Sequence, residues 1–230
     1  MLGAVKPPSG RMTVVLDPWV SAQFLGIVGG TLSGEAVQKG RSLFADRLGE
    51  DVAAPLLTLV DDPTDSAAHT ATGSDGEGLA TRRNVLMADG RLKRFVHNSE
   101  TARRAGTVST GSAVRGYSST PGVGVRAVAV AGGDRPPAEL IAAIDDGLLV
   151  QGVTGLHSGV NAVSGDFSTG AEGLRIRGGA LAEPVREFTI ASTIQKMLLD
   201  VLAIGDDVRW LPMRAAGVTL VIGELTVSGM

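Results

Sequence analysis

The stretch Leu174–Leu181, with the sequence LRIRGGAL, decides the fold class. Its apolar and charged residues alternate as far as Arg177, which is the period of a half-buried strand. The pair Gly178-Gly179 then offers a two-residue turn, and the apolar residues that follow favour a second strand. The stretch therefore predicts an antiparallel hairpin.

Strand and hairpin patterns recur outward from this hairpin in both directions. Asp89-Gly90 between two strand-like runs and Gly223-Glu224 near the end both indicate tight turns. Because hairpins outnumber strand–helix–strand units, the sequence predicts an α+β fold with a mainly antiparallel sheet. The expected strands and hairpins cover residues 12–16, 55–60, 83–96, 125–131, 147–153, 165–168 and 218–227.

A few packed helices and long loops complete the predicted fold. The first helix is expected to start at Pro18 and to break or bend at Gly29-Gly30. Stretches rich in Gly, Ser and Thr at 63–80 and 105–124 predict long Gly/Ser-rich loops. The remaining expected helices cover residues 34–48, 100–104, 136–147 and 192–202.

The composition indicates a folded chain with a substantial core, because 43% of its 230 residues are hydrophobic. No apolar run reaches the roughly 18 residues that would span a bilayer, so no membrane partner is expected. The net charge of −3 gives no indication of a nucleic-acid surface. The absence of cysteine excludes disulfides and thiolate ligands and fits a cytoplasmic protein.

The histidines do not form a zinc motif by their spacing. A catalytic zinc needs three protein ligands that converge. His69, His97 and His157 are far apart, and none is paired at i, i+4 or i, i+5 with another histidine or a carboxylate on an expected helix. Each is interpreted as an isolated polar residue of a loop or a strand end.

Other catalytic patterns are equally incomplete. The adjacent carboxylates at 61–62, 145–146 and 206–207 are typical of caps and turns. Thr110–Val114 lacks the second glycine of a nucleophile elbow. Gly122–Arg126 has two glycines of a dinucleotide pattern but precedes a strand instead of following one. The residues alone therefore provide no self-sufficient catalytic site.

The stretch Ser33–Gly40, with the sequence SGEAVQKG, predicts the start of a capped helix. Glu35 and Lys39 stand four residues apart, the spacing of a solvent-exposed ion pair on a helix. Periodicity alone gives this stretch no further meaning.

Several stretches together resemble a known family. The resemblance is to the C-terminal domain of the TldD/PmbA family, in its PmbA (TldE) branch, and it covers the chain as one domain, 1–230. The family's chains continue upstream, so its N-terminal domain is expected to be absent. The stretches that carry the resemblance are Pro8–Pro18, Leu32–Ser42, Pro55–Pro63 with Thr81–Arg83, Gly159–Ser168, Pro184–Glu187 and Ile204–Arg209.

The resemblance implies a degenerate metal site. In the family, the TldD-type subunit binds zinc through a His-Glu-x-x-x-His helix and a cysteine. When the chain is aligned on Glu35, Gly34 and Lys39 occupy the two histidine positions. Glycine has no donor atom, and a protonated lysine is a poor zinc ligand. The resemblance therefore implies no catalytic residue, metal or cofactor in this chain, with zinc only in a TldD-type partner.

The function implied is that of a non-catalytic subunit of a cytoplasmic peptidase system. It would pair with a TldD-type zinc subunit, or form a homodimer, and help to bind unfolded or leader-bearing peptides. Strand addition at a sheet edge is a suitable mode for an extended peptide. The candidate peptide-binding residues are Asn161, Gly165, Asp166, Phe167 and Ser168, for which a structural turn is the alternative.

Two other functions remain open from the sequence. One is an active metallopeptidase whose metal site uses His69, His97 or His157 with nearby carboxylates. The other is a regulatory module that binds another protein.

Overall fold

The computed structural model describes residues 3–230, which form two compact units. Unit 1 contains the chain up to Ser21, Gly132–Arg209 and Gly217–Met230, and unit 2 contains Ala22–Ala131 and Trp210–Ala216. Both units contain strands and helices, as an α+β fold does. None of the helices in the described part is long and apolar enough to cross a membrane.

Unit 1 contains the hairpin that Leu174–Leu181 predicts. The strands are β1 (Gly10–Leu16), β8 (Asp146–Thr154), β9 (Asp166–Arg177), β10 (Ala180–Thr193), β11 (Val201–Ile204) and β14 (Leu220–Ser228). The helices are α4 (Pro137–Ala142), α5 (Leu156–Gly159) and α6 (Ile194–Leu199). The turn between β9 and β10 is Gly178-Gly179, and both glycines have positive φ.

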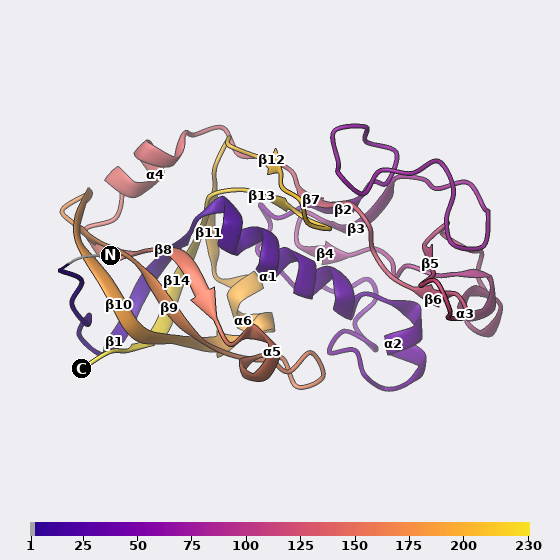
Figure 1. The fold of residues 1–230 in the computed structure, drawn as a ribbon, viewed down its shortest axis with the longest axis horizontal. Helices are drawn as coiled ribbons and strands as arrows, with labels where there is room; N and C mark the ends of the chain where they lie inside the picture. The colour runs from indigo at the N-terminus through magenta and orange to yellow at the C-terminus, as the bar shows by residue number, and fades with distance from the viewer. Residues whose placement is uncertain (1–2) are drawn as a thin grey trace. The chain divides into compact units, whose positions relative to one another are not determined.

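Five strands of unit 1 close into a barrel. The order is β1-β8-β9-β10-β14, and β14 pairs again with β1. The β1–β8 ladder is parallel, and the other ladders of this sheet are antiparallel. β10 and β11 both pair with the edge of β14 that faces away from β1. β11 pairs with the first half of β14, and β10 pairs with its second half. Figure 1 shows β9 and β10 as the long curved strands of this unit. Each of these five strands therefore pairs with two neighbours, although β10 pairs with β14 only over Thr189–Ala191.

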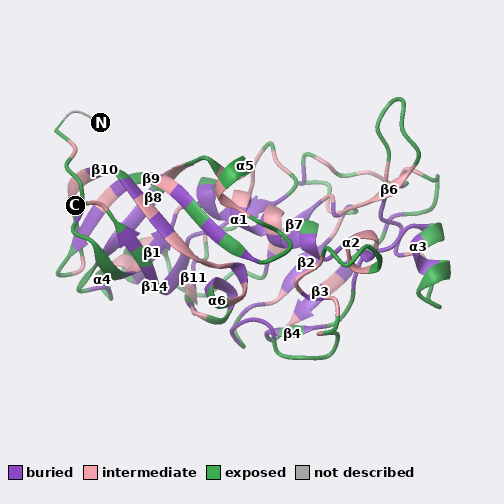
Figure 2. Ribbon diagram, turned by 90° about the horizontal axis from the view of Figure 1, so that it is seen from below, coloured by how far each residue is buried: buried purple, intermediate pink, exposed green. Residues whose placement is uncertain are grey.

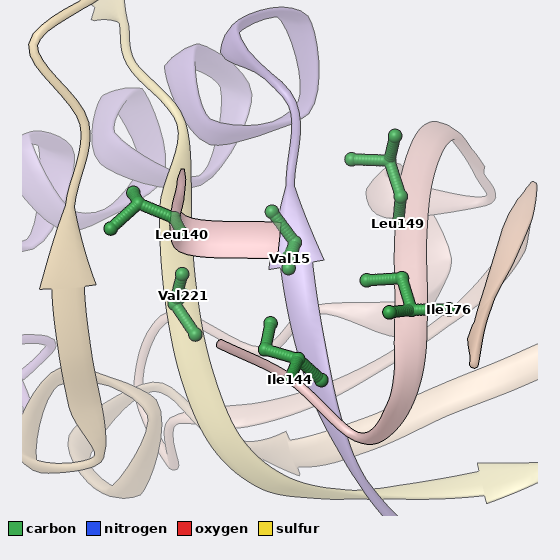
Figure 3. Close-up of a cluster of buried hydrophobic side chains, with 6 residues drawn as sticks. All are labelled: Val15, Leu140, Ile144, Leu149, Ile176 and Val221. Atoms are coloured by element: carbon green, nitrogen blue, oxygen red, sulfur yellow. The ribbon is translucent and has the colours of Figure 1, made fainter. Parts of the chain in front are cut away.

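Apolar residues from the strands and from α4 fill one part of this unit. Figure 3 shows Val15, Leu149, Ile176 and Val221 from the strands beside Leu140 of α4 and the following Ile144. Burial alternates along β9, as Figure 2 shows by the change between buried and exposed residues. This alternation places the odd-numbered residues from Phe167 to Arg175 on the buried face, so Leu174 is only half-buried and Arg175 is buried, the reverse of what the LRIR pattern predicts; Ile176 and Arg177 lie as it predicts.

The expected hairpin at Gly223-Glu224 is wrong, because β14 is a continuous strand. Met12 pairs with Leu225 and Val14 pairs with Ile222, so Gly223 and Glu224 lie opposite the single residue Thr13. Two residues opposite one define a β-bulge. Glu224 takes the positive φ of 46° that this bulge requires. The turn-like dipeptide therefore bends a barrel strand.

Arg175 is a charged residue inside unit 1, with only 3% of its surface exposed. Its Nη2 lies 2.6 Å from Asp146 Oδ2, and its Nη1 donates to Met12 Sδ at 2.7 Å. Its Nε has no hydrogen-bond partner among the described residues. The Asp146 carboxylate is therefore the counter-charge that makes the burial of this guanidinium tolerable.

Asp146→Ala should lower the free energy of unfolding by about 1–2 kcal/mol. This is less than the 3–5 kcal/mol of a wholly buried pair because the Asp146 side chain is 55% exposed. Urea unfolding measures the loss. Asp145→Ala is the control, because Arg175 makes no ion pair with Asp145. An equal loss in both variants would contradict the assigned role of Asp146.

Unit 2 is built on a small sheet of order β4-β3-β2-β7. Its strands are β2 (Leu59–Asp61), β3 (Asn84–Ala88), β4 (Arg91–Leu92) and β7 (Val128–Val130), with a separate hairpin of β5 (Ala113–Val114) and β6 (Gly122–Val123). Its helices are α2 (Gly34–Gln38) and α3 (Ser99–Arg104). Helix α1 (Pro18–Thr31) begins in unit 1 and ends in unit 2. β12 (Arg209–Trp210) and β13 (Ala216–Gly217) pair where the chain enters and leaves unit 2.

The helix boundaries near Gly29 and Gly40 differ from those predicted. α1 continues through Gly29-Gly30. A Cβ at position 29 would lie 2.9 Å from Val125 Cγ2, so this glycine allows a close approach instead of a break. α2 ends at Gln38, about ten residues before the predicted end, because Gly40 takes a φ of 64° that a helix cannot continue.

The two predicted loops contain more order than expected. Asp75 is buried in the first loop, where its Oδ1 accepts from Glu77 N and Leu79 N at 2.9 and 3.0 Å. Its Oδ2 accepts from Ala113 N at 3.1 Å, which ties the first loop to the second. The second loop contains the β5–β6 hairpin. Side-chain acceptors therefore replace regular strands and helices as the partners of loop N–H groups.

Candidate functional site

The helix that would carry a metal motif is a single short segment of unit 2. α2 begins after Ser33, whose side chain makes no capping hydrogen bond. Gly34 N donates to Val96 O at 2.8 Å, and Ser33 and Val96 form a parallel bridge. The start of α2 is therefore fixed to the segment that carries His97.

Gly34 lies directly against the His97 side chain. A Cβ at position 34 would overlap the imidazole ring and would lie 3.0 Å from Val96 O. Any side chain at this position requires His97 to move, because real Cβ atoms do not approach so closely. The His97 ring therefore fills the space beside the backbone where a ligand at position 34 would start.

His97 is buried and neutral in character. Only 8% of its surface is exposed, and burial lowers its pKa. Its Nδ1 lies 3.2 Å from Thr101 Oγ1, and this hydroxyl donates its proton to Asn98 Oδ1 at 2.9 Å. Because a threonine hydroxyl has one proton, Nδ1–H of His97 is the donor to Thr101. Nε2 is then the nitrogen with the lone pair.

Glu35 and Lys39 form the ion pair that their spacing predicts. The hydrogen bond from Lys39 is the main cause that lowers the pKa of Glu35, while partial burial opposes it. The side chains are 37% and 55% exposed, respectively, so the pair contributes only a few tenths of a kcal/mol. The Lys39 ammonium is held by this carboxylate, and an ammonium group has no lone pair for a metal.

Two cavities of unit 2 border α2. One, of about 390 Å³, is lined by Gly34, Val37 and His97 together with Phe95, Val108 and Thr110 among others. The other, of about 420 Å³, is lined by Glu35 and Lys39 together with Asn98, Arg104 and Thr120 among others. Gly34 and Lys39, which align with the two histidines of the zinc motif, thus line different cavities, and Gln38 lines both.

These residues do not fit a zinc ion. Gly34 supplies no donor, Lys39 is paired with Glu35, and the chain has no cysteine. Within residues 3–230, no three His, Cys, Asp or Glu side chains are grouped so that they could hold a metal. His69 is exposed in a loop of unit 2, and His157 is exposed on α5 in unit 1. The structure therefore does not bring the three histidines together as ligands.

The candidate peptide-binding residues lie in unit 1, at the turn that leads into β9. Asn161 Oδ1 accepts from Val163 N at 2.9 Å and from Ser164 N at 3.2 Å. Gly165 has a φ of 87°, and its carbonyl accepts from Ile194 N at 2.7 Å. The local hydrogen bonds of Asn161 and Gly165 are those of a structural turn.

The first residues of β9 divide between the interior and the surface. Phe167 is 3% exposed, so its side chain belongs to the core. Asp166 and Ser168 are exposed on either side of it. A peptide-binding role of the five candidates stays a prediction, and only Asp166, Ser168 and Asn161 have exposed side chains.

Sequence reasoning missed the role of His97 beside Gly34. These residues are far apart in the sequence, and they meet because Ser33 pairs with Val96. A local signal is Asn98, which stands directly before α3 and is of a residue type that caps helices. Its Oδ1 accepts from Thr101 N at 2.9 Å, as a cap does. That same helix turn holds the His97 ring through Thr101.

Comparison with known proteins agrees with the resemblance found in the sequence. A 30% identical relative is a metalloprotease of Methanothermobacter thermautotrophicus, aligned over 91% of this chain and 46% of the relative. Metalloprotease PmbA of Escherichia coli O157:H7 is 27% identical over 95% of the chain and 46% of its own length. The crystal structure of TldE from Thermococcus kodakarensis matches with a TM-score of 0.91 at 27% identity, over 99% of this chain and 52% of that one.

The chain spans about half the length of the curated relatives that it matches. The family description of the PmbA/TldA metallopeptidase C-terminal domain matches residues 9–229, which includes α2, His97 and the whole barrel. The chain therefore belongs to the PmbA/TldA metallopeptidase family, as a C-terminal domain of that family.

Proposed function

We propose that this chain is a non-catalytic component of a TldD/PmbA-type metallopeptidase system in the cytoplasm. It pairs with a zinc-bearing TldD-type subunit and helps to bind extended peptides, such as unfolded or leader-bearing ones. The observation that carries this proposal is the state of α2, where Gly34 lies against His97 and Lys39 is paired with Glu35. These residues leave no group that could hold or activate a metal-bound water.

The remaining carboxylate supports the same proposal. Glu35 stands where a metallopeptidase would have its general base, and its pKa is lowered by Lys39. A general base works best when its pKa lies near the working pH. A carboxylate whose pKa falls below its ordinary value of 4.5 moves away from that range. Glu35 is therefore suited to an ion pair on the surface of α2.

The proposal is tested by mixing this chain with a zinc-bearing TldD-type homologue. Unfolded casein and a leader peptide should be cleaved by the mixture at least about tenfold faster than by either chain alone, which would correspond to about 1.4 kcal/mol. The cleavage products are measured by mass spectrometry. Glu35→Gln in this chain should leave the activity of the mixture unchanged within about twofold.

Two results would contradict the proposal. Cleavage by this chain alone at the rate of the mixture would show an active enzyme with an unrecognised metal site. Loss of the mixture's activity in Glu35→Gln would show that this carboxylate takes part in the reaction. A pair that co-purifies but cleaves no faster than its separate chains would favour a regulatory module.

A further inference from the structure

A third cavity of unit 2 is lined by three arginines. It has a volume of about 380 Å³ and is lined in part by the loop of the β5–β6 hairpin. Arg115 comes from the loop of that hairpin, Arg126 precedes β7, and Arg214 lies in the 210–216 segment. No acidic residue lines the cavity. The cavity therefore concentrates positive charge on a chain whose net charge is −3.

The arginines have donors to spare. In the described part of the chain, none of the three forms an ion pair with a carboxylate. Arg126 Nη2 donates to Ala113 O at 3.1 Å, and Arg115 Nε donates to Ser119 O at 3.2 Å. Arg126 Nε is buried without a partner among the described residues. A guanidinium has five N–H donors, so most of them remain unused here.

The walls around these arginines are held by hydrogen bonds to the backbone and within the hairpin loop. Thr70 Oγ1 donates to Arg126 O, which fixes the backbone that carries the Arg126 side chain. Gly116 N donates to Ser119 Oγ at 3.0 Å, which shapes the hairpin loop. Thr120 and Gly122 separate this cavity from the one beside Glu35 and Lys39, because both cavities include them. The charged cavity is thus a neighbour of the degenerate site.

We propose that this cavity binds a carboxylate of a peptide, either its C-terminal carboxylate or an acidic side chain. The inference rests on the proposed function, in which the chain binds extended peptides. Guanidinium groups bind carboxylates through paired N–H donors, with a geometry that lysine does not offer. A cavity of about 380 Å³ is in the size range of small-ligand pockets and accommodates one peptide residue. The expected consequence is a preference for acidic peptides.

The preference is measured by fluorescence anisotropy with labelled hexapeptides of glycine, serine and alanine. One peptide is neutral and amidated, one has a free C-terminal carboxylate, and one is amidated with a single internal glutamate. At least one carboxylate peptide should bind about tenfold more tightly than the neutral one, and added salt should weaken this preference. The peptide that binds tightly shows whether the cavity takes a C-terminal carboxylate or an acidic side chain.

Arg214→Gln should reduce the preference to within about twofold, because it removes one of the three charges. Its side chain makes no hydrogen bond with a described residue, so the variant is expected to fold normally. Arg126→Gln should have the same effect on the preference. The urea unfolding midpoint of this variant is first compared with that of the wild type, to check that the variant folds. Arg82→Gln is the matched control, an exposed arginine of unit 2 outside the cavity.

Equal affinity for all three peptides would overturn the inference. So would a preference that survives in both Arg214→Gln and Arg126→Gln. Failure of the inference is separable from failure of the proposed function. A mixture with the zinc-bearing homologue that cleaves neutral peptides, without a carboxylate preference, contradicts this inference alone. A carboxylate preference in a chain that never supports cleavage contradicts the proposed function alone.

Discussion

Asp61→Ala is expected to lower the free energy of unfolding by about 3–4 kcal/mol. Asp61 is fully buried at the end of β2, and its Oδ1 accepts from Arg126 N at 2.9 Å and Ala127 N at 2.8 Å. Alanine would leave both backbone donors without this acceptor, and each buried orphan costs about 1–3 kcal/mol. These donors lie just before β7, so the loss affects the pairing of β7 with β2. Urea unfolding of the wild type and the variant measures it.

Asp61→Asn is the matched control because it keeps an oxygen for both donors. It should lose less than half of what alanine loses. Burial is the main cause that raises the pKa of Asp61 above its ordinary value of 3.8. Between that value and the raised one, the folded state binds more protons, so the stability of the wild type falls as the pH rises. The cost of Asp61→Asn should therefore shrink between about pH 4 and pH 7.

Equal losses in the alanine and asparagine variants would show that the two hydrogen bonds do not stabilise the fold. A cost of Asp61→Asn that grows with pH would have the wrong sign for a carboxyl group whose pKa is raised by burial.

Gly34→Ala is expected to destabilise the protein by about 2–3 kcal/mol. The new Cβ would overlap the His97 ring and lie 3.0 Å from Val96 O, a backbone atom held in the Ser33–Val96 bridge. Overpacking of this kind typically costs about 1–3 kcal/mol, and displacement of His97 also removes its contact with Thr101. Gly26→Ala in α1 is the control, since nothing lies within 4 Å of its Cβ. It should be neutral or stabilising by up to about 1 kcal/mol.

A double-mutant cycle assigns the effect to His97. In a His97→Ala background, Gly34→Ala should cost at least about 1 kcal/mol less than it does in the wild type. The comparison is made by urea unfolding of the four proteins. If the cost of Gly34→Ala were the same in both backgrounds, the ring would not be what excludes a side chain from position 34.

Local signals predicted the elements whose causes are local. Asp89-Gly90 forms the turn between β3 and β4, and both residues have positive φ, as a tight hairpin turn requires. Asn98 caps α3 through Thr101 N. Gly178-Gly179 joins β9 to β10. In each case the residues that determine the structure are adjacent in the sequence.

The errors share a different physical origin. Gly29 is accepted inside α1 because Val125 and Val128 approach it, and these residues are distant in the sequence. Gly223-Glu224 forms a bulge because β1 pairs along β14 and closes the barrel. Closure joins the first and last strands of unit 1, and no local pattern reports such a pairing. Tertiary pairing therefore overrode the local preference for a break and a turn.

The same distinction applies to the candidate site. The Glu35–Lys39 pair followed from helical spacing and is present. The assignment of Gly34 and Lys39 to the two ligand positions stays a prediction from the family resemblance, and the comparison shows the family alone. The sequence did not predict that the His97 ring lies against Gly34 or that three arginines line one cavity. In each case the residues come from segments that are far apart in the sequence.

We infer that this chain cannot hold a catalytic zinc ion, because Gly34 and Lys39 offer no ligand. The most direct measurement is metal analysis of the chain, purified without a histidine tag, incubated with two equivalents of zinc and then desalted. The result predicted is far less than one zinc per chain, unchanged by Glu35→Gln or His97→Gln. If one zinc per chain survived desalting and either substitution removed it, the inference that the chain cannot hold zinc would be wrong.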